Sequence, residues 1–216
     1  RDIAVALRKV SGKKVSMIWH KETKIPKLDL IVIPGGFSYG DYLRSGAMAA
    51  HSPVIREVVS HSKKGALVLG ICNGFQILTE SGLLPGVLLR NASLKFICRS
   101  VHLRVESINN PFTKGYAKKQ TVKIPIAHGD GNYFINKNGI KEIEDNEQIA
   151  FRYCNAEGEI NTESNPNGSL MNIAGILNRN KNVLGMMPHP ERVSDKFTGG
   201  SDGEILFQGI VEGLSK

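Results

Sequence analysis

The feature that most constrains this chain is a cysteine between two glycines, at the point where an apolar run gives way to a helical pattern. Residues 65–69 read Gly-Ala-Leu-Val-Leu, a short apolar run typical of a strand buried on both faces, and a helical pattern begins at Phe75. Cys72 would occupy the turn between them, where Gly70 and Gly74 leave room for a sharp bend. The helix N-terminus behind the sulfur favours a thiolate. The pattern predicts a nucleophile elbow, with a buried structural cysteine as the alternative.

A second segment supplies the groups that a cysteine nucleophile needs, which are a base and a residue that orients the base. Residues 186–192 read Met-Met-Pro-His-Pro-Glu-Arg. Because flanking prolines keep such a segment extended, side chains two residues apart point the same way, so His189 and Glu191 can share one face. The carboxylate would then hold the imidazole and stabilise its cation. Taken alone, the same tripeptide is also compatible with a surface turn.

A third segment, residues 30–42, is again an apolar run that ends in glycines. A glycine-rich loop after a strand can direct backbone N–H groups at a developing oxyanion. An ordinary strand-ending turn is the alternative for this loop.

The order of patterns along the chain predicts an α/β fold. Helical and apolar strand patterns alternate in the first half, which implies a mostly parallel sheet flanked by helices, with the site at the carboxyl ends of the strands. After Gly86 the apolar runs shorten, and Asn-Gly pairs at 138–139 and 167–168 favour tight hairpins in a smaller antiparallel extension. The expected helices are 2–10, 43 to about 50, a helix capped by Ser52 that starts at Pro53, and 204–214; the expected strands are 15–19, 30–33, 67–71 and 183–186.

Together these motifs resemble the triad-type (class I) glutamine amidotransferases, whose domain is flavodoxin-like. Within that group, the strings at 34–44, 72–78, 94–99, 127–132 and 185–192 resemble the glutaminase subunits of phosphoribosylformylglycinamidine synthases, a family of purine biosynthesis. The resemblance runs from about Asp2 to the C-terminus. It implies that the chain is a single amidotransferase domain, residues 1–216.

The resemblance also implies a mechanism and a set of site residues. Cys72 attacks the side-chain amide carbon of L-glutamine, His189 protonates the leaving ammonia and then activates water, and Glu191 orients His189. The expected oxyanion donors are the backbone N–H groups of Gly36 or Phe37 and of Asn73, and the expected substrate-binding residues are Gln76, His128 and Asp130. For Gln76 the alternative is a helix surface residue, and for His128 a turn histidine satisfied by the backbone.

The partners follow from the same resemblance, because free ammonia in water is lost to protonation. The expected partners are a large synthetase subunit, which carries ATP and Mg and converts formylglycinamide ribonucleotide to formylglycinamidine ribonucleotide, and a small accessory subunit. The segment 37–44 is expected to meet the synthetase, with local packing as the alternative. Two other functions stay open: an amidotransferase or cysteine hydrolase that serves another acceptor, and an inactive docking subunit.

The front of the chain departs from the family pattern. Family members begin with a short strand and a glycine-containing loop before the helix expected at 2–10, whereas this chain begins with Arg1 at that helix. About a dozen family residues are therefore expected to be absent, either because the sequence is a fragment or because its start was lost or misassigned. A real loss would remove an inner strand of the sheet and put activity in doubt.

Composition excludes several classes of protein. The 216 residues carry a net charge of +8, but the basic residues are scattered and aromatic residues are only 6%, so we expect no nucleic-acid partner. No apolar run approaches the roughly 20 residues that cross a bilayer. Three cysteines favour a reducing compartment, here the cytoplasm, over a disulfide framework, and Cys98 and Cys154 are expected to be buried core thiols. No histidine has the spacing of a metal ligand, so no metal is expected.

Overall fold

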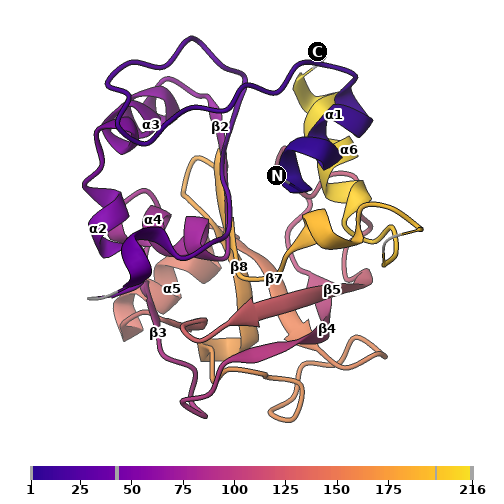
Figure 1. Ribbon diagram of the computed structural model, residues 1–216. Helices are drawn as coiled ribbons and strands as arrows, with labels where there is room; N and C mark the ends of the chain where they lie inside the picture. The colour runs from indigo at the N-terminus through magenta and orange to yellow at the C-terminus, as the bar shows by residue number, and fades with distance from the viewer. Residues whose placement is uncertain (1, 42–43, 198, 215–216) are drawn as a thin grey trace.

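The computed structural model describes residues 2–41, 44–197 and 199–214 (Figure 1). Within these residues a seven-stranded sheet has the strand order β1-β2-β9-β8-β7-β4-β5, and a second sheet pairs β3 with β6. The strands are β1 (Leu30–Ile33), β2 (Leu67–Ile71), β3 (Val87–Leu89), β4 (Ile97–Val105), β5 (Thr121–His128), β6 (Asn132–Phe134), β7 (Ile149–Cys154), β8 (Ile173–Leu177) and β9 (Val183–Met186). The α-helices are α1 (Asp2–Ser11), α2 (Ala47–Ala50), α3 (Pro53–Lys63), α4 (Asn73–Glu80), α5 (Lys137–Asp145) and α6 (Glu204–Leu214), and the 3-10 helices are η1 (Ser38–Asp41), η2 (Leu170–Asn172) and η3 (Pro190–Val193).

The main sheet is mixed. Strand β2 pairs in parallel with β1 and with β9, in a register that places Leu67 beside Leu30 and Val68 beside Val183. The remaining ladders, from β9 through β8, β7 and β4 to β5, are antiparallel. The predicted α/β class and its antiparallel part are confirmed, but the parallel strands are not the majority. The reason lies in the connections: β8 and β9 are joined by a five-residue turn, residues 178–182, and a turn this short can only join antiparallel strands.

Helices cover both faces of the parallel strands (Figure 1). Helices α3 and α4 contact β2 on one face, while α1 packs against α6 on the other. All five residues of β2 and all four of β9 are buried, as expected for apolar strands covered on both sides. The two strands that precede the predicted nucleophile and base therefore lie side by side at the centre of the molecule.

The antiparallel part curls back toward the parallel part. Strand β5 is the far edge of the sheet, yet the carbonyl of its Pro125 accepts a hydrogen bond from the His189 N–H at 2.8 Å, just beyond β9. The carbonyl of Ala127 lies 3.7 Å from the Cys72 sulfur. Proline is tolerated at this position because β5 is an edge strand that pairs only with β4. The curl thus brings the end of β5 over the carboxyl ends of β2 and β9.

Most predicted elements of the first half are confirmed, including β1, β2, β9, the first and last helices, and the helix that starts at Pro53 after Ser52. Helix α2 ends at Ala50 as expected, whereas Leu43, where it was expected to begin, lies outside the described residues.

The strand predicted at 15–19 is wrong. These residues are outside any ladder, and the side chains of Met17 and Trp19 are 74% and 64% exposed. A strand needs a paired neighbour, and alternating apolar residues cannot supply one. Residues 13–18 instead line one wall of a cavity of about 720 Å³, which extends to α1, α3, the end of α6 and β1, the edge strand.

The hairpins predicted at the Asn-Gly pairs are also wrong. Asn138 and Gly139 lie inside α5, because the side chain of Asn136 caps this helix by accepting a hydrogen bond from the Gly139 N–H at 2.9 Å. Asn167 and Gly168 lie in the long connection between β7 and β8. There the Asn167 side chain donates to the carbonyl of Gly131 at 2.8 Å.

One prediction concerns the alignment of β2 with β9. The buried side chain of Asn182, just before β9, donates to the carbonyl of Ser62 in the last turn of α3 at 2.8 Å and to that of Ala66, just before β2, at 3.0 Å. Asn182→Ala leaves both carbonyls without this donor, so we expect the free energy of unfolding, measured in urea, to fall by about 1–3 kcal/mol. Asn180→Ala, in the same turn but exposed, is the control and should change stability by less than about 0.5 kcal/mol. Equal effects of the two substitutions would contradict this role of Asn182.

Candidate active site

Cys72 lies on a strained turn between β2 and α4. Its backbone has φ 51° and ψ −107°, a conformation that costs a non-glycine residue free energy and is typical of nucleophile elbows. The turn closes because two glycines allow it: a β-carbon on Gly74 would overlap the carbonyl of Ile33 in β1, and one on Gly70 would lie 2.7 Å from the carbonyl of Gly74. The Cys72 N–H donates to Met186 of β9 at 2.8 Å. The predicted elbow is therefore present.

His189 and Glu191 form a buried pair three and five residues beyond the end of β9. Nδ1 of His189 lies 2.7 Å from Oε1 of Glu191, and the two side chains are only 3% and 9% exposed. When Nδ1 donates its proton to the carboxylate, the other ring nitrogen becomes the basic one. That nitrogen, Nε2, is buried and makes no hydrogen bond with the described residues. The imidazole of His189 is thus oriented so that Nε2 is available to accept a proton or a hydrogen bond.

The glycine loop after β1 lies between the nucleophile and this histidine. A β-carbon on Gly35 would fall 2.8 Å from Cε1 of His189 and 3.4 Å from Cβ of Cys72. Both side chains therefore pack against the same α-carbon, which only glycine allows. The three motifs that the sequence singled out converge at this point.

The predicted oxyanion donors lie on the same loop and on α4. Among the described residues, neither the Gly36 N–H nor the Phe37 N–H has a hydrogen-bond acceptor. Asn73 is the first residue of α4, so its N–H is one of the amides that a helix leaves unpaired at its N-terminus. Amide groups in the loop after β1 and at the start of α4 are consequently available to a negatively charged oxygen.

The side chains of Asn73 and Gln76 are joined in a buried chain of hydrogen bonds. Oδ1 of Asn73 accepts from the N–H and the hydroxyl of Ser38, at 3.2 and 2.5 Å, and its Nδ2 donates to Oε1 of Gln76 at 2.8 Å. Nε2 of Gln76 donates to the backbone carbonyl of Asp130 at 2.7 Å. Gln76 is not the helix surface residue considered above, since it is 4% exposed and both ends of its amide are engaged.

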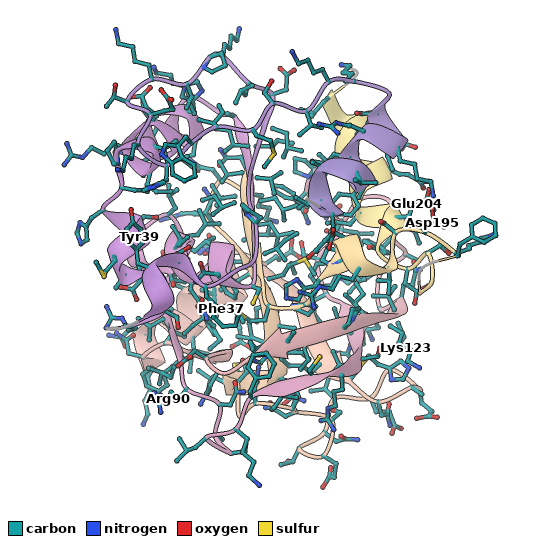
Figure 2. All side chains as sticks on the ribbon, viewed as in Figure 1. Phe37, Tyr39, Arg90, Lys123, Asp195 and Glu204 are labelled. Carbon is teal, nitrogen blue, oxygen red and sulfur yellow. The ribbon has the colours of Figure 1, made fainter. Side chains whose placement is uncertain are left out.

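Asp130 presents its carboxylate near solvent. Its side chain is 34% exposed, and Oδ1 lies 4.0 Å from Nε of Arg90, an exposed side chain (Figure 2). A pair of this kind, exposed to water, stabilises the fold little and leaves the carboxylate able to meet a ligand.

His128 is a second buried histidine at the site. Its Nδ1 lies 3.0 Å from Oδ1 of Asn91, and the same oxygen accepts from the Gly131 N–H at 3.0 Å, so Nδ1 carries the proton. Burial, and secondarily the nearby His189, lowers the pKa of His128 to about 4. Its Nε2 is buried without an acceptor or donor among the described residues. His128 is therefore a neutral imidazole with an unpaired acceptor at neutral pH.

Asn91 was missed by the sequence analysis. Its side chain also donates to the carbonyls of Lys95 and His128, at 2.8 and 2.9 Å, and its N–H donates to Gly129 at 2.8 Å. These bonds join the segment before β4 to the turn after β5. No local pattern marks Asn91, because its partners at the end of β5 and in the turn after it are distant in the sequence.

The remaining cysteines differ from one another. Cys154 is buried as predicted, and burial raises the pKa of its thiol to about 11. The prediction that Cys98 is buried is wrong, because it lies on the exposed first half of β4, where the side chains of residues 98–100 are all exposed. In the part of the chain that the structure describes, no three His, Cys, Asp or Glu side chains gather into a group that could hold a metal ion.

Comparison with known proteins places this site in a family. Residues 2–201 match the model of the CobB/CobQ-like glutamine amidotransferase domain. The chain is 56% identical to phosphoribosylformylglycinamidine synthase subunit PurQ of Rhodopseudomonas palustris (strain HaA2), over 99% of this chain and 92% of that protein. It is 54% identical to the protein of the same name from Acaryochloris marina, over 99% of this chain and 91% of that one.

Solved structures agree with the sequence relatives. The structure of PurLQS from Thermotoga maritima contains a chain that superposes with a TM-score of 0.86 and 43% identity, covering 99% of this chain and 92% of that one. A Thermoplasma acidophilum protein assigned as a GMP synthase subunit shares the fold, with a TM-score of 0.66 and 13% identity over 100% of this chain and 87% of that one. The chain therefore belongs to the glutamine amidotransferase family, in the branch of the phosphoribosylformylglycinamidine synthase PurQ subunits.

Proposed function

We propose that this chain hydrolyses L-glutamine and supplies the ammonia to a synthetase that converts formylglycinamide ribonucleotide to formylglycinamidine ribonucleotide in purine biosynthesis. The observation that carries the proposal is the convergence of the Cys72 elbow and the buried His189–Glu191 pair on Gly35. Membership of the PurQ branch supports the choice of acceptor, because the cysteine chemistry itself does not depend on it.

The first half of the reaction forms a thioester. The Cys72 sulfur, as thiolate, adds to the side-chain amide carbon of glutamine, and the carbonyl oxygen becomes an oxyanion held by the N–H groups of Phe37 or Gly36 and of Asn73. His189, protonated at Nε2 with the proton taken from the thiol, gives that proton to the leaving nitrogen. The carbon–nitrogen bond then breaks, and ammonia and a glutamyl thioester on Cys72 remain.

The second half hydrolyses the thioester. Nε2 of His189 takes a proton from water as the water oxygen adds to the thioester carbon, and the same N–H groups hold the second oxyanion. The carbon–sulfur bond breaks, glutamate leaves, and the thiolate or its protonated form is restored. Throughout, Glu191 holds the Nδ1–H of His189, so the same ring nitrogen acts as acid and base.

We place the partner of this chain at the loop that carries Phe37. The side chains of Phe37, Tyr39 and Met48 are 72%, 43% and 44% exposed, and Phe37 and Tyr39 lie on the same side of the molecule (Figure 2). Exposed aromatic residues beside a site are typical of protein interfaces. Arg44 is held locally instead, by two hydrogen bonds of 2.7 and 2.6 Å to Glu80.

The Thermotoga maritima structure, described as PurLQS, supports a large synthetase subunit and a small accessory subunit as the partners. The sequence has no phosphate-binding G-x-x-x-x-G-K motif, so we assign ATP and Mg to the synthetase. None of the described helices is long and apolar enough to cross a membrane. We place the reaction in the cytoplasm, where cysteines such as these stay reduced.

The nucleophile can be identified by trapping. After incubation with glutamine or a chloroketone analogue of it, with the synthetase subunits present, we expect mass spectrometry to find the adduct on Cys72, and Cys72→Ala to have no detectable glutaminase activity. Cys98→Ala removes the exposed thiol and should retain both the adduct and the activity. Glutamine turnover by Cys72→Ala, or an adduct only on Cys98, would exclude Cys72 as the nucleophile.

The role of Glu191 can be tested with Glu191→Gln, which keeps the size of the side chain and removes its charge. Because the amide neither fixes the ring tautomer as firmly nor stabilises the imidazolium, we expect kcat for glutamine hydrolysis to fall by at least about tenfold. The matched control is Glu157→Gln at an exposed site, for which kcat should not change. An unchanged kcat in Glu191→Gln would show that His189 needs no carboxylate.

The buried, neutral state of His128 predicts a pH dependence of stability. In the unfolded chain His128 titrates near pH 6.5 and in the folded protein near 4, so only the unfolded state gains the proton between these values. The contribution of neutral His128 to the free energy of unfolding is therefore complete above about pH 6.5. As the pH falls to about 4 this contribution is lost, which lowers the free energy of unfolding by up to ~3 kcal/mol. We expect urea unfolding of His128→Gln to show a smaller loss between pH 7 and pH 4.5 than the unsubstituted protein.

The exposed His51 provides the control for this experiment, since His51→Gln should follow the unsubstituted protein at every pH. Identical pH profiles for His128→Gln and the unsubstituted protein would mean that another group accounts for the acid loss.

A further inference from the structure

We propose that Asn73 is a positioning residue. Its side chain sets the distance between the nucleophile elbow and the loop that carries the proposed oxyanion amides, and Gln76 extends this restraint to the turn after β5. This inference rests on the proposed glutaminase reaction and assigns a side chain that takes no part in the bond changes described above.

The direction of every hydrogen bond in the chain Ser38–Asn73–Gln76–Asp130 is determined by its two ends. At one end the Ser38 backbone N–H can only donate, so the atom of Asn73 that faces it is Oδ1. At the other end the Asp130 backbone carbonyl can only accept, so the atom of Gln76 that faces it is Nε2. The middle bond, from Nδ2 of Asn73 to Oε1 of Gln76, then has the one orientation that satisfies both ends.

This chain of hydrogen bonds joins the three segments that surround the Cys72 sulfur. Ser38 directly follows Phe37, one of the proposed oxyanion donors, and Asn73 directly follows Cys72. Asp130 belongs to the turn after β5, the strand whose Ala127 carbonyl lies 3.7 Å from the sulfur. Two buried amide side chains, those of Asn73 and Gln76, therefore link the loop after β1 to the turn after β5.

The part of the loop around Phe37 depends on this restraint, because few other side-chain hydrogen bonds hold it among the described residues. Tyr39 and Gly40 have φ values of 57° and 70°, a left-handed conformation that is unfavourable for tyrosine, and Phe37 is 72% exposed. Among the described residues, the side-chain bonds of residues 34–40 are those of Ser38 to Asn73 and of Tyr39 to Nδ1 of His20, at 2.8 Å. Without Asn73, the Phe37 N–H is expected to move relative to Cys72.

A displaced oxyanion donor lowers kcat and leaves the thiol itself intact. An error of about 1 Å in placing reacting groups can cost about a hundredfold in rate, and loss of one oxyanion donor costs a similar factor or more. Alkylation of Cys72 by iodoacetamide passes through no oxyanion, so its rate depends on the thiolate alone. The two rates together distinguish positioning from a general disturbance of the site.

The test uses the full chain with the synthetase subunits present and measures kcat and KM for glutamine, the rate of Cys72 alkylation and the temperature of unfolding. For Asn73→Ala we expect kcat to fall about ten- to hundredfold, KM to change less than kcat, and alkylation to stay within about twofold. Ser38→Ala should lower kcat less than Asn73→Ala does. The kcat of the double variant should be no lower than that of Asn73→Ala alone, because the two substitutions remove the same contact. Ser38→Thr retains the hydroxyl and should restore kcat.

Asn110→Ala is the matched control. Asn110 is also a buried asparagine whose side chain accepts from two backbone N–H groups, those of Phe112 and Thr113, but it lies in the connection at the opposite ends of β4 and β5. We expect it to lower the unfolding temperature without changing kcat.

The proposal is overturned if Asn73→Ala turns over glutamine as fast as the unsubstituted chain, or if its kcat and its rate of Cys72 alkylation fall together. It is also overturned if the effects of Asn73→Ala and Ser38→Ala on kcat are additive, or if Asn110→Ala loses as much activity as Asn73→Ala. These results differ from a failure of the proposed function, in which the unsubstituted chain with its partners shows no Cys72-dependent glutamine hydrolysis; that result would overturn both proposals.

Discussion

The rest of the structure depends on the strained backbone of Cys72, whose φ is positive. That conformation is unfavourable for a residue with a side chain, so it persists only because its surroundings determine it. The Cys72 N–H is bound to Met186 of the neighbouring strand, and α4 lies so close to β1 that Gly74 has no room for a β-carbon beside Ile33. The strained turn and the parallel core therefore support each other: a looser core would let the turn relax and move the sulfur away from His189.

The parallel strands alone would leave the site open on one side, and the curl of the sheet closes it. Strand β5 is separated from β9 by three strands of the sheet, yet its Pro125 carbonyl accepts a hydrogen bond from the His189 N–H. The base is thus held by Glu191 at its ring and by β5 at its backbone. Because the edge strand β5 helps to hold the base, a change in the twist of the antiparallel strands would be transmitted to His189.

Polar groups at the site are buried at a cost to stability. Nε2 of both His128 and His189 and Oε2 of Glu191 lack hydrogen-bond partners among the described residues, although buried polar atoms are usually paired. Asn91 and Asn73 offset part of this cost, because the Asn91 side chain satisfies three backbone groups and the Asn73 side chain satisfies the Ser38 N–H. A site of this kind holds its acceptors ready for a ligand, and the asparagines that surround it keep those acceptors in place.

The sequence by itself determined the parts of this protein that depend on neighbouring residues. Glycines around Cys72 indicate a tight turn, the His-Pro-Glu segment indicates a shared face, and unbroken apolar runs indicate buried strands, because each property follows from local stereochemistry. Only the tertiary structure decided which segments meet. Residues 15–19 alternate like a strand but have no pairing partner, Asn138-Gly139 is drawn into a helix by the cap at Asn136, and Cys98 is left on an uncovered face. The contacts of Asn91 with His128 and Gly131, and those of Asn73 with Ser38, join residues 35 to 40 positions apart, and no local pattern encodes contacts that form only when neighbouring strands bring their ends together.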